Sequence, residues 1–247
     1  MKETRLIMGM PIEIEIVGEG VQKARETAFA YLVAVDERFS TYKEESEISR
    51  INRGELSSAA ASEEMQEVFQ IAEKTKEETR GYFDVCRPDG RFDPSGIVKG
   101  WAIRNTAALV RNAGYENYFV NAGGDIAMGG KNAKGEEWSV GIRNPFNIHE
   151  IVEVVYPRGK GIATSGSYIR GNHIYNPHKP EEELREIVSI TVIGPDVLEA
   201  DRFATAAFAM GKKGIEFIEQ LPGFEGYSID ATGIATLTSG FGAYTHP

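Results

Sequence analysis

Residues 199–211 read Glu199-Ala200-Asp201-Arg202-Phe203-Ala204-Thr205-Ala206-Ala207-Phe208-Ala209-Met210-Gly211. Alanine favours helix, and a glycine just past the last apolar residue is a common helix end, so the stretch predicts a short helix that stops at Gly211. Apolar side chains recur at helical spacing from Phe203 to Met210 and form a stripe that should pack against a core. We expect the rest of the chain to be organised around this helix.

The same stretch carries two polar side chains four residues apart. Asp201 and Thr205 place a carboxylate and a hydroxyl on one face of the helix. Two hard oxygens in this arrangement can hold Mg²⁺, or orient a phosphate through it. The pair is also explained by an N-terminal acid stabilised by the helix dipole, beside a threonine that bonds back to the helix. The second pattern is the commoner one, and these residues alone leave both interpretations open.

Composition limits the class of protein. The chain has 247 residues, of which 41% are hydrophobic and 26% charged, as in a globular protein with an ordinary core. The net charge of -10 argues against a nucleic-acid partner, so an anionic substrate would need a metal, a helix N-terminus or glycine amides to receive it. Cys86 is the single cysteine, which excludes an intrachain disulfide. It follows an apolar run, and we expect it to be buried.

The chain shows no segment that predicts export or membrane insertion. Its first residues lack an apolar stretch of signal-peptide length, and no run of about 18 apolar residues occurs. A cytoplasmic protein is the simplest expectation. An exported or membrane-anchored protein whose signal has been removed is the alternative.

Periodicity predicts a mixed α+β fold in a single domain spanning residues 1–247, with a largely antiparallel sheet and packed helices. Residues 12–16 alternate strictly between isoleucine and glutamate, as expected for a strand with one buried face. Helices are expected over residues 21–40 and 62–80, the second capped by Ser62, and from the 93–96 turn to about residue 113. Ser46 is expected to cap a further short helix. The other predicted strands are residues 83–85, 118–121, 138–142, 151–156, 161–167, 187–193, 226–230 and 233–238.

Two further features could belong to a site. The glycine-bearing turn of residues 93–96 opens a helix, where free amides and the positive end of the dipole can receive an anion. His173 stands among small polar residues and can exchange protons near neutral pH, although a structural role explains it equally well. The sequence contains no G-x-S-x-G elbow, H-E-x-x-H motif or P-loop, so it does not support those hydrolase classes.

Seven groups of residues, taken in order, resemble the FAD:protein FMN transferases of the ApbE family. No one group is decisive, but their order along nearly the whole chain makes coincidence improbable. The groups are STY with SEISRIN at residues 40–52, GYFDV at 81–85, DPSGIVKGWA at 93–102, NAGGDI at 121–126, ATSG at 163–166, HIYNP at 173–177 and EADRFATA at 199–206.

The resemblance implies a T-fold-like architecture and a reaction in which FAD gives its FMN half to a threonine or serine hydroxyl of a target flavoprotein, releasing AMP. It implies Mg²⁺ held by Asp201, Thr205 and the Gly96 carbonyl, with Asp201 or His173 removing the hydroxyl proton. It further implies that the flavin and adenine pockets are lined by Met8, Tyr42, Tyr82, Phe83, Asp84, Asp93, Lys99 and Ile174.

Two departures from the family pattern concern one wall of the implied pocket. The span from Val85 to Asp93 is shorter than in many relatives, and Cys86 stands where threonine is usual. A carrier that only binds FAD, or a pyrophosphatase that splits it into AMP and FMN, is the alternative to the transferase.

Overall fold

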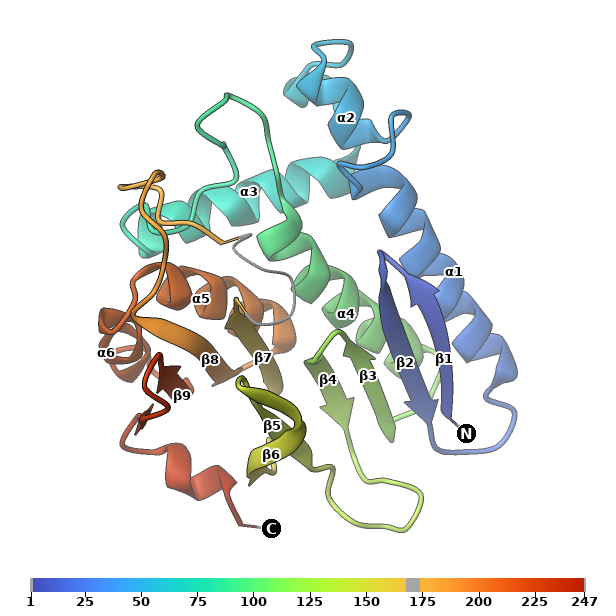
Figure 1. Cartoon of the computed structure of the whole chain (residues 1–247). Helices are drawn as coiled ribbons and strands as arrows, with labels where there is room; N and C mark the ends of the chain where they lie inside the picture. The colour runs from blue at the N-terminus through green and yellow to red at the C-terminus, as the bar shows by residue number, and fades with distance from the viewer. Residues whose placement is uncertain (1, 168–173, 247) are drawn as a thin grey trace.

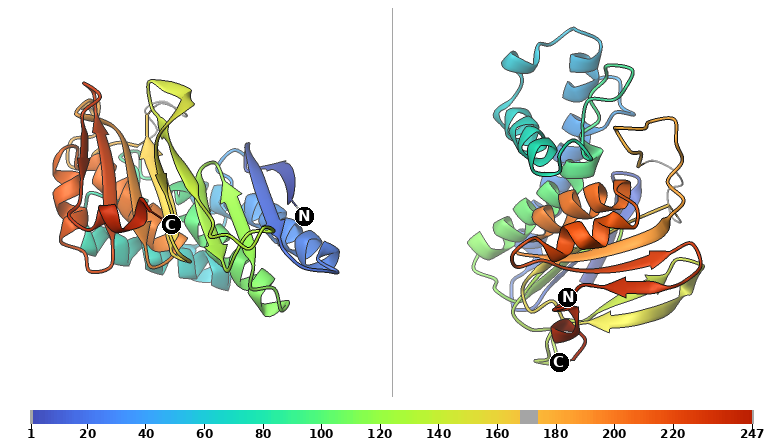
Figure 2. Two further views of the ribbon diagram at one scale, coloured as in Figure 1. Left: turned by 90° about the horizontal axis from the view of Figure 1, so that it is seen from below. Right: turned by 90° about the vertical axis from the view of Figure 1, so that its left-hand side faces the viewer.

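A large antiparallel sheet forms the framework of the molecule, with helices on one face and a small β-ribbon on the other (Figures 1 and 2). The computed structural model describes residues 2–167 and 174–246. The sheet has the order β1-β2-β3-β4-β7-β8-β9-β10. Its strands are β1 (Lys2–Ile7), β2 (Met10–Ile16), β3 (Tyr118–Ala122), β4 (Asp125–Gly129), β7 (Gly161–Gly166), β8 (Ile187–Gly194), β9 (Glu225–Asp230) and β10 (Ala235–Leu237). The ribbon consists of β5 (Val140–Asn144) and β6 (Asn147–Val155).

Two central helices cover the middle of the sheet. Helix α4 (Ser95–Asn112) packs on β3 and β4, and α5 (Val197–Ala209) packs on β7 and β8. The two helices also pack on each other, so their N-terminal halves meet above the centre of the sheet. The remaining helices are α1 (Gln22–Phe39), α2 (Glu47–Asn52), α3 (Glu63–Glu78) and α6 (Lys213–Glu219), with short 3₁₀ turns η1 (Ser58–Ala60) and η2 (Phe241–Tyr244).

Strand alternation divides the core into layers. On β8, Ile190 and Val192 face α5, whereas Ile193 faces the ribbon and packs with Ile142 and Val155. Because both faces of this strand are covered, most of its residues are buried and the period-2 pattern of a half-exposed strand disappears. The α+β class with a largely antiparallel sheet is confirmed.

Local signals at helix ends are also confirmed. Ser46 and Ser62 accept hydrogen bonds from the backbone N–H of Ser49 and Met65 at 3.2 and 3.3 Å, as N-caps should. Helix α5 ends before Gly211, whose φ of +64° is the left-handed conformation that glycine adopts without strain. Its start lies two residues before the predicted stretch, because Asp196 caps Glu199 N–H at 3.0 Å.

Three predictions about strands and burial were wrong. Residues 83–85 form no strand, because the N–H of Phe83 bonds to Thr79 Oγ1 and the Asp84 carboxylate accepts from Cys86 N–H. The chain therefore turns outward after Val85, and Cys86 is exposed rather than buried. The predicted strand 138–142 begins only at Val140 and joins the ribbon instead of pairing with β4.

A helix that crosses a membrane must be both long and apolar. Among the described residues, no helix meets both requirements.

Candidate active site

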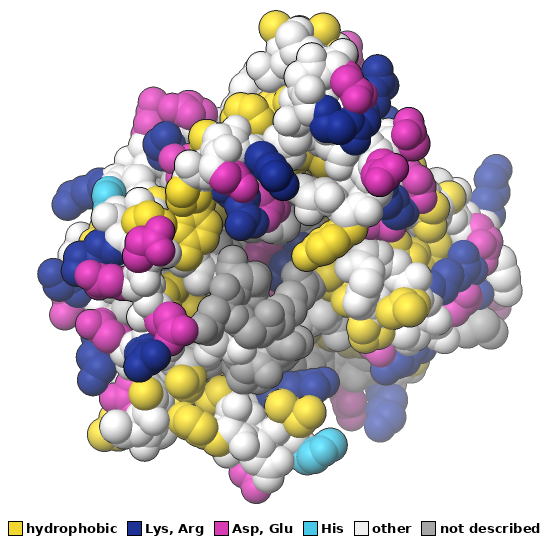
Figure 3. All heavy atoms as spheres, turned by 45° about the horizontal axis from the view of Figure 1, so that its top comes forward, with side chains coloured by type: hydrophobic (Ala, Val, Ile, Leu, Met, Phe, Trp, Pro, Cys, Tyr) yellow, Lys and Arg dark blue, Asp and Glu magenta, His cyan; other side chains and the backbone are white. Residues whose placement is uncertain are grey.

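A cavity opens where α4, α5 and β7 meet, on the face seen in Figure 3. Charged side chains of both signs gather above the hollow in that view. The space inside the cavity and its open mouth together amounts to about 1040 Å³. Its lining residues are Tyr82, Phe83, Asp84, Arg87, Asp93, Ser95, Gly96, Lys99, Gly123, Thr164, Ser165, Gly166, Ile174, Tyr175, Pro177, Asp201 and Thr205.

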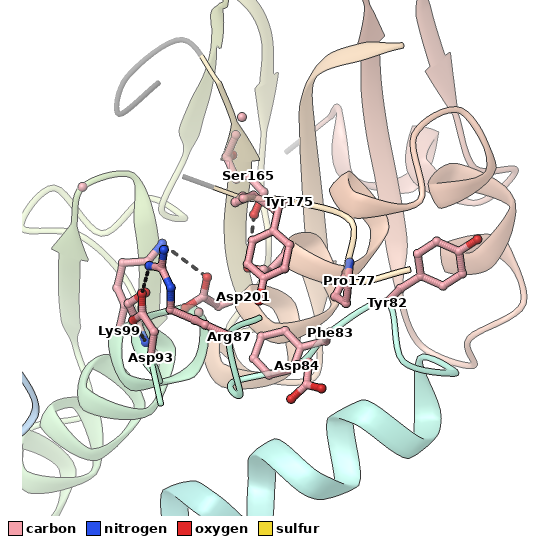
Figure 4. Close-up of a pocket in the computed structure, with 17 residues that line it drawn as sticks. Tyr82, Phe83, Asp84, Arg87, Asp93, Lys99, Ser165, Tyr175, Pro177 and Asp201 are labelled. Carbon is pink, nitrogen blue, oxygen red and sulfur yellow. Dashed lines mark hydrogen bonds and ion pairs between the residues drawn. The ribbon is translucent and has the colours of Figure 1, made fainter. Parts of the chain in front are cut away.

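The floor of the cavity is a charged cluster of Lys99, Asp125 and Asp201. Lys99 Nζ is ion-paired with Asp125 and lies 3.3 Å from Asp201 Oδ1. Asp125 comes from the start of β4 and is fixed by a hydrogen bond of 3.0 Å from Thr164 N–H on β7. The carboxylate side chains are only 1% and 3% exposed. Side chains from α4, α5 and β4 therefore converge on one buried point. Figure 4 shows two of them, Lys99 and Asp201.

Glycine at position 100 allows α4 and α5 to approach so closely. Its N–H donates to Asp201 Oδ2 at 2.8 Å across 101 residues of sequence. A Cβ atom at this position would lie 2.8 Å from Asp201 Cβ and 2.9 Å from Leu198 Cα, distances that side chains do not adopt. The contact places the Asp201 carboxylate at the first turns of α4, where the positive end of the helix dipole lies.

The charges of the cluster do not balance. Two buried carboxylates face one ammonium group, so either a proton on one carboxylate or a further cation is needed to balance them. Burial raises the pKa of Asp201 to about 8; Asp125 adds to this rise, whereas Lys99 opposes it. A cation bound beside Asp201 would supply the missing compensation.

Two of the predicted Mg²⁺ ligands, Gly96 and Thr205, lie side by side. A Cβ on Gly96 would lie 3.4 Å from Thr205 Cγ2, and Thr205 Oγ1 is 3.4 Å from Ser165 Oγ. Asp201, Gly96 and Thr205 all line the cavity. The described residues contain no group of three or more His, Cys, Asp and Glu side chains suited to a metal. A metal here would therefore depend on hydroxyl and carbonyl oxygens beside a single carboxylate, which suits a hard cation such as Mg²⁺.

The eight residues predicted to line the flavin and adenine pockets divide between two adjoining cavities. Met8 and Tyr42 line the second cavity, which shares Asp93, Ser95 and Lys99 with the first. The other six line the first cavity; they are Tyr82, Phe83, Asp84, Asp93, Lys99 and Ile174. His173, the predicted proton carrier, lies outside the described residues.

Figure 4 distinguishes the aromatic side chains of the first cavity. The rings of Phe83 and Tyr175 lie beside the space above Asp201, whereas the ring of Tyr82 points away from it. Tyr82 thus lines the margin of the cavity rather than its interior. Burial raises the pKa of Tyr175, so its hydroxyl stays neutral and available for hydrogen bonding.

Sequence reasoning missed two charged residues of the site. Asp125 follows paired glycines directly after a strand, a position that could have signalled an acid held at a sheet end, yet nothing local indicates its pairing with Lys99. Arg87 reaches over the cavity to Asp93 at 3.5 Å, from a turn that sequence alone describes only as polar.

The chain is similar to known proteins of one family. The model of the ApbE family matches residues 8–88 and 86–228. The FAD:protein FMN transferase of Vibrio cholerae is 33% identical over 135 residues, 51% of this chain and 40% of that protein. The FAD:protein FMN transferase of Klebsiella pneumoniae is 31% identical over 151 residues, 58% of this chain and 43% of that protein. The chain thus spans less than half the length of these relatives.

A solved structure extends the likeness to the whole fold. The flavin transferase ApbE from Vibrio cholerae superposes with a TM-score of 0.87 and 24% identity, covering 99% of this chain and 98% of that one. At this identity the likeness establishes a shared fold.

Proposed function

The chain belongs to the ApbE family, and from this we propose that it transfers the FMN half of FAD to a threonine or serine hydroxyl of an acceptor flavoprotein, releasing AMP. The observation that carries the proposal is the buried cluster of Lys99, Asp125 and Asp201 beside one cavity, close to the junction with a second. A dinucleotide has two ring systems joined by a pyrophosphate. Two cavities that share Asp93, Ser95 and Lys99 suit such a ligand.

The residues at the junction suit the pyrophosphate. Ser95 begins α4, so the positive end of that helix faces the shared space. Lys99, one turn further on, brings an ammonium group to the same place. Asp201, Thr205 and the Gly96 carbonyl would hold Mg²⁺, which neutralises charge on phosphoryl oxygens when bound.

The proposed reaction exchanges one phosphorus–oxygen bond for another. The acceptor hydroxyl oxygen forms a bond to the FMN phosphorus, the anhydride bond breaks, and AMP leaves with the bridging oxygen. The hydroxyl proton passes to a base, for which Asp201 and His173 are the two candidates of this chain. Lys99 and the N-terminus of α4 stabilise the charge that grows on the leaving phosphate.

The test is to incubate the protein with FAD, Mg²⁺ and a folded acceptor flavoprotein or a threonine-containing peptide from it. We expect the acceptor to gain the mass of one FMN less one water while AMP appears in equal amount. AMP with free FMN and an unmodified acceptor would instead identify a pyrophosphatase, and FAD binding without AMP would identify a carrier. Asp201→Ala should abolish Mg²⁺-dependent turnover, with Glu216→Gln on the exposed side of α6 as the matched control.

A further inference from the structure

Two segments far apart in the sequence form adjoining walls of the first cavity. Residues 82–84 supply one wall, and Ile174, Tyr175 and Pro177 supply the other. Neither segment belongs to a helix or a strand, so no ladder of backbone hydrogen bonds fixes the distance between them. The contacts between them that the structure shows are made by a side chain.

His178 connects the two walls. Its Nε2 atom lies 3.0 Å from the carbonyl oxygen of Arg80, immediately before the first wall. Its ring meets that of Tyr82 edge to face, with centroids 4.7 Å apart and planes at 74°. Its own N–H donates to Asn176 Oδ1 at 2.9 Å, which orders the turn that follows the second wall. One side chain thus contacts the opposite segment through a polar and an aromatic interaction.

The backbone of the first wall is shaped to receive this ring. Arg80 and Gly81 both have left-handed φ values, +53° and +79°, at the end of α3. A Cβ on Gly81 would lie 3.2 Å from His178 Cε1, closer than most side-chain contacts. Glycine therefore leaves the space that the histidine ring needs, in a conformation that other residues rarely adopt.

The orientation of Tyr82 agrees with a role in this contact. Its ring lies at the margin of the cavity and points away from Asp201 in Figure 4, so it does not offer a stacking surface to a ligand above the cluster. The ring is instead the partner of His178. Phe83, the next residue, is buried and lies beside Gly96 in the cavity.

We propose that His178 is a positioning residue that, together with Tyr82, holds residues 174–177 against residues 82–84 and sets the width of the cavity for one ring system of the dinucleotide. The identity of that ligand rests on the proposed function. The contact itself belongs to the free chain, so it can be tested without turnover.

The test compares His178→Ala, His178→Phe, Tyr82→Ala and the double alanine variant with the unaltered protein. Amide hydrogen exchange of the free protein should accelerate at residues 80–84 and 174–178 in His178→Ala and remain unchanged elsewhere. The Kd for FAD, read from flavin fluorescence, should rise about 5- to 10-fold, because an edge-to-face pair and an exposed hydrogen bond are each modest. The KM for FAD should rise likewise, with kcat within about twofold.

The remaining variants separate positioning from a general loss of stability. His178→Phe keeps the ring contact and should fall between His178→Ala and the unaltered protein. The double variant should bind FAD no more weakly than the weaker single variant, since either change already breaks the pair. His149→Ala, on the exposed edge strand β6, is the matched histidine control and should change neither measurement.

Two outcomes would overturn the proposal: unchanged exchange and Kd in His178→Ala, or purely additive effects in the double variant. These are distinct from a failure of the proposed function. A protein that binds FAD but transfers no FMN would refute the transferase while hydrogen exchange and Kd still decide the role of His178.

Discussion

Replacing Gly100 by alanine is the sharpest test of the site's construction. The new methyl group would lie 2.8 Å from Asp201 Cβ and 2.9 Å from Leu198 Cα, so α5 must move away from α4. The second of these atoms is backbone, and no change of rotamer can relieve the clash. The hydrogen bond of 2.8 Å from Gly100 N–H to Asp201 Oδ2 should lengthen as a result.

Two opposing effects decide the sign of the stability change. Alanine is about 1 kcal/mol better than glycine inside a helix. Overpacking a buried contact costs about 1–3 kcal/mol, and more where backbone must move. We therefore expect a net loss of about 1–2 kcal/mol. For a chain of this size such a loss lowers Tm by about 2–8 °C.

Thermal unfolding and Mg²⁺-dependent turnover of FAD measure the two consequences. Gly242→Ala is the matched control, because Gly242 has open space around the position of a Cβ and an ordinary φ. It should change Tm by less than about 2 °C. If Gly100→Ala were as stable as the unaltered protein and turned over FAD at the same rate, the close approach of α4 and α5 would not position Asp201, and our account of the site would be refuted.

Three further outcomes follow from the charged groups. The pKa of Asp201 is raised to about 8 from 3.8, so the folded form binds more protons between these values. In a chelator, stability should therefore fall as the pH rises from about 4 to 8, and Asp201→Asn should flatten that dependence in urea titrations. Lys99→Met leaves Asp125 and Asp201 without their ammonium partner and should cost about 3–5 kcal/mol, partly recovered by Mg²⁺ in the same assay. Arg202→Met breaks the pairing of a buried guanidinium with half-exposed Glu78, for which chemical denaturation should show a loss of about 1–3 kcal/mol.

Local signals predicted the parts of the fold that depend on neighbouring residues. The caps at Ser46 and Ser62 and the helix end at Gly211 require only residues within one turn, and all three are present. Alternation identified residues 12–16, whose isoleucines are fully buried on one face of β2. The physical cause of each of these patterns lies within a few neighbouring residues, so a single sequence is enough to find them.

Two kinds of contact escaped sequence reasoning: local hydrogen bonds from side chains to the backbone, and pairs between distant segments. The apolar run at residues 83–85 suggests a strand. Its neighbouring N–H groups instead donate to the hydroxyl of Thr79 and the carboxylate of Asp84, so no strand partner is needed. Lys99 and Asp125 pair across 26 residues, and Gly100 meets Asp201 across 101. Neither pairing has a periodicity that could reveal it. These four residues lie within the motifs that resemble the family, but the motifs alone do not show which of the side chains are in contact.

The construction of the cluster is itself an argument for a ligand. Burying two carboxylates against one ammonium lowers stability. Such features persist where function requires them, because an apolar arrangement of similar volume would serve the fold as well. A positively charged group bound beside Asp201 would balance the charge, and a dinucleotide reaching from the first cavity into the second would give the helix N-terminus between them an anion to face. The same residues that cost the free chain stability are therefore the ones through which it would bind its substrate.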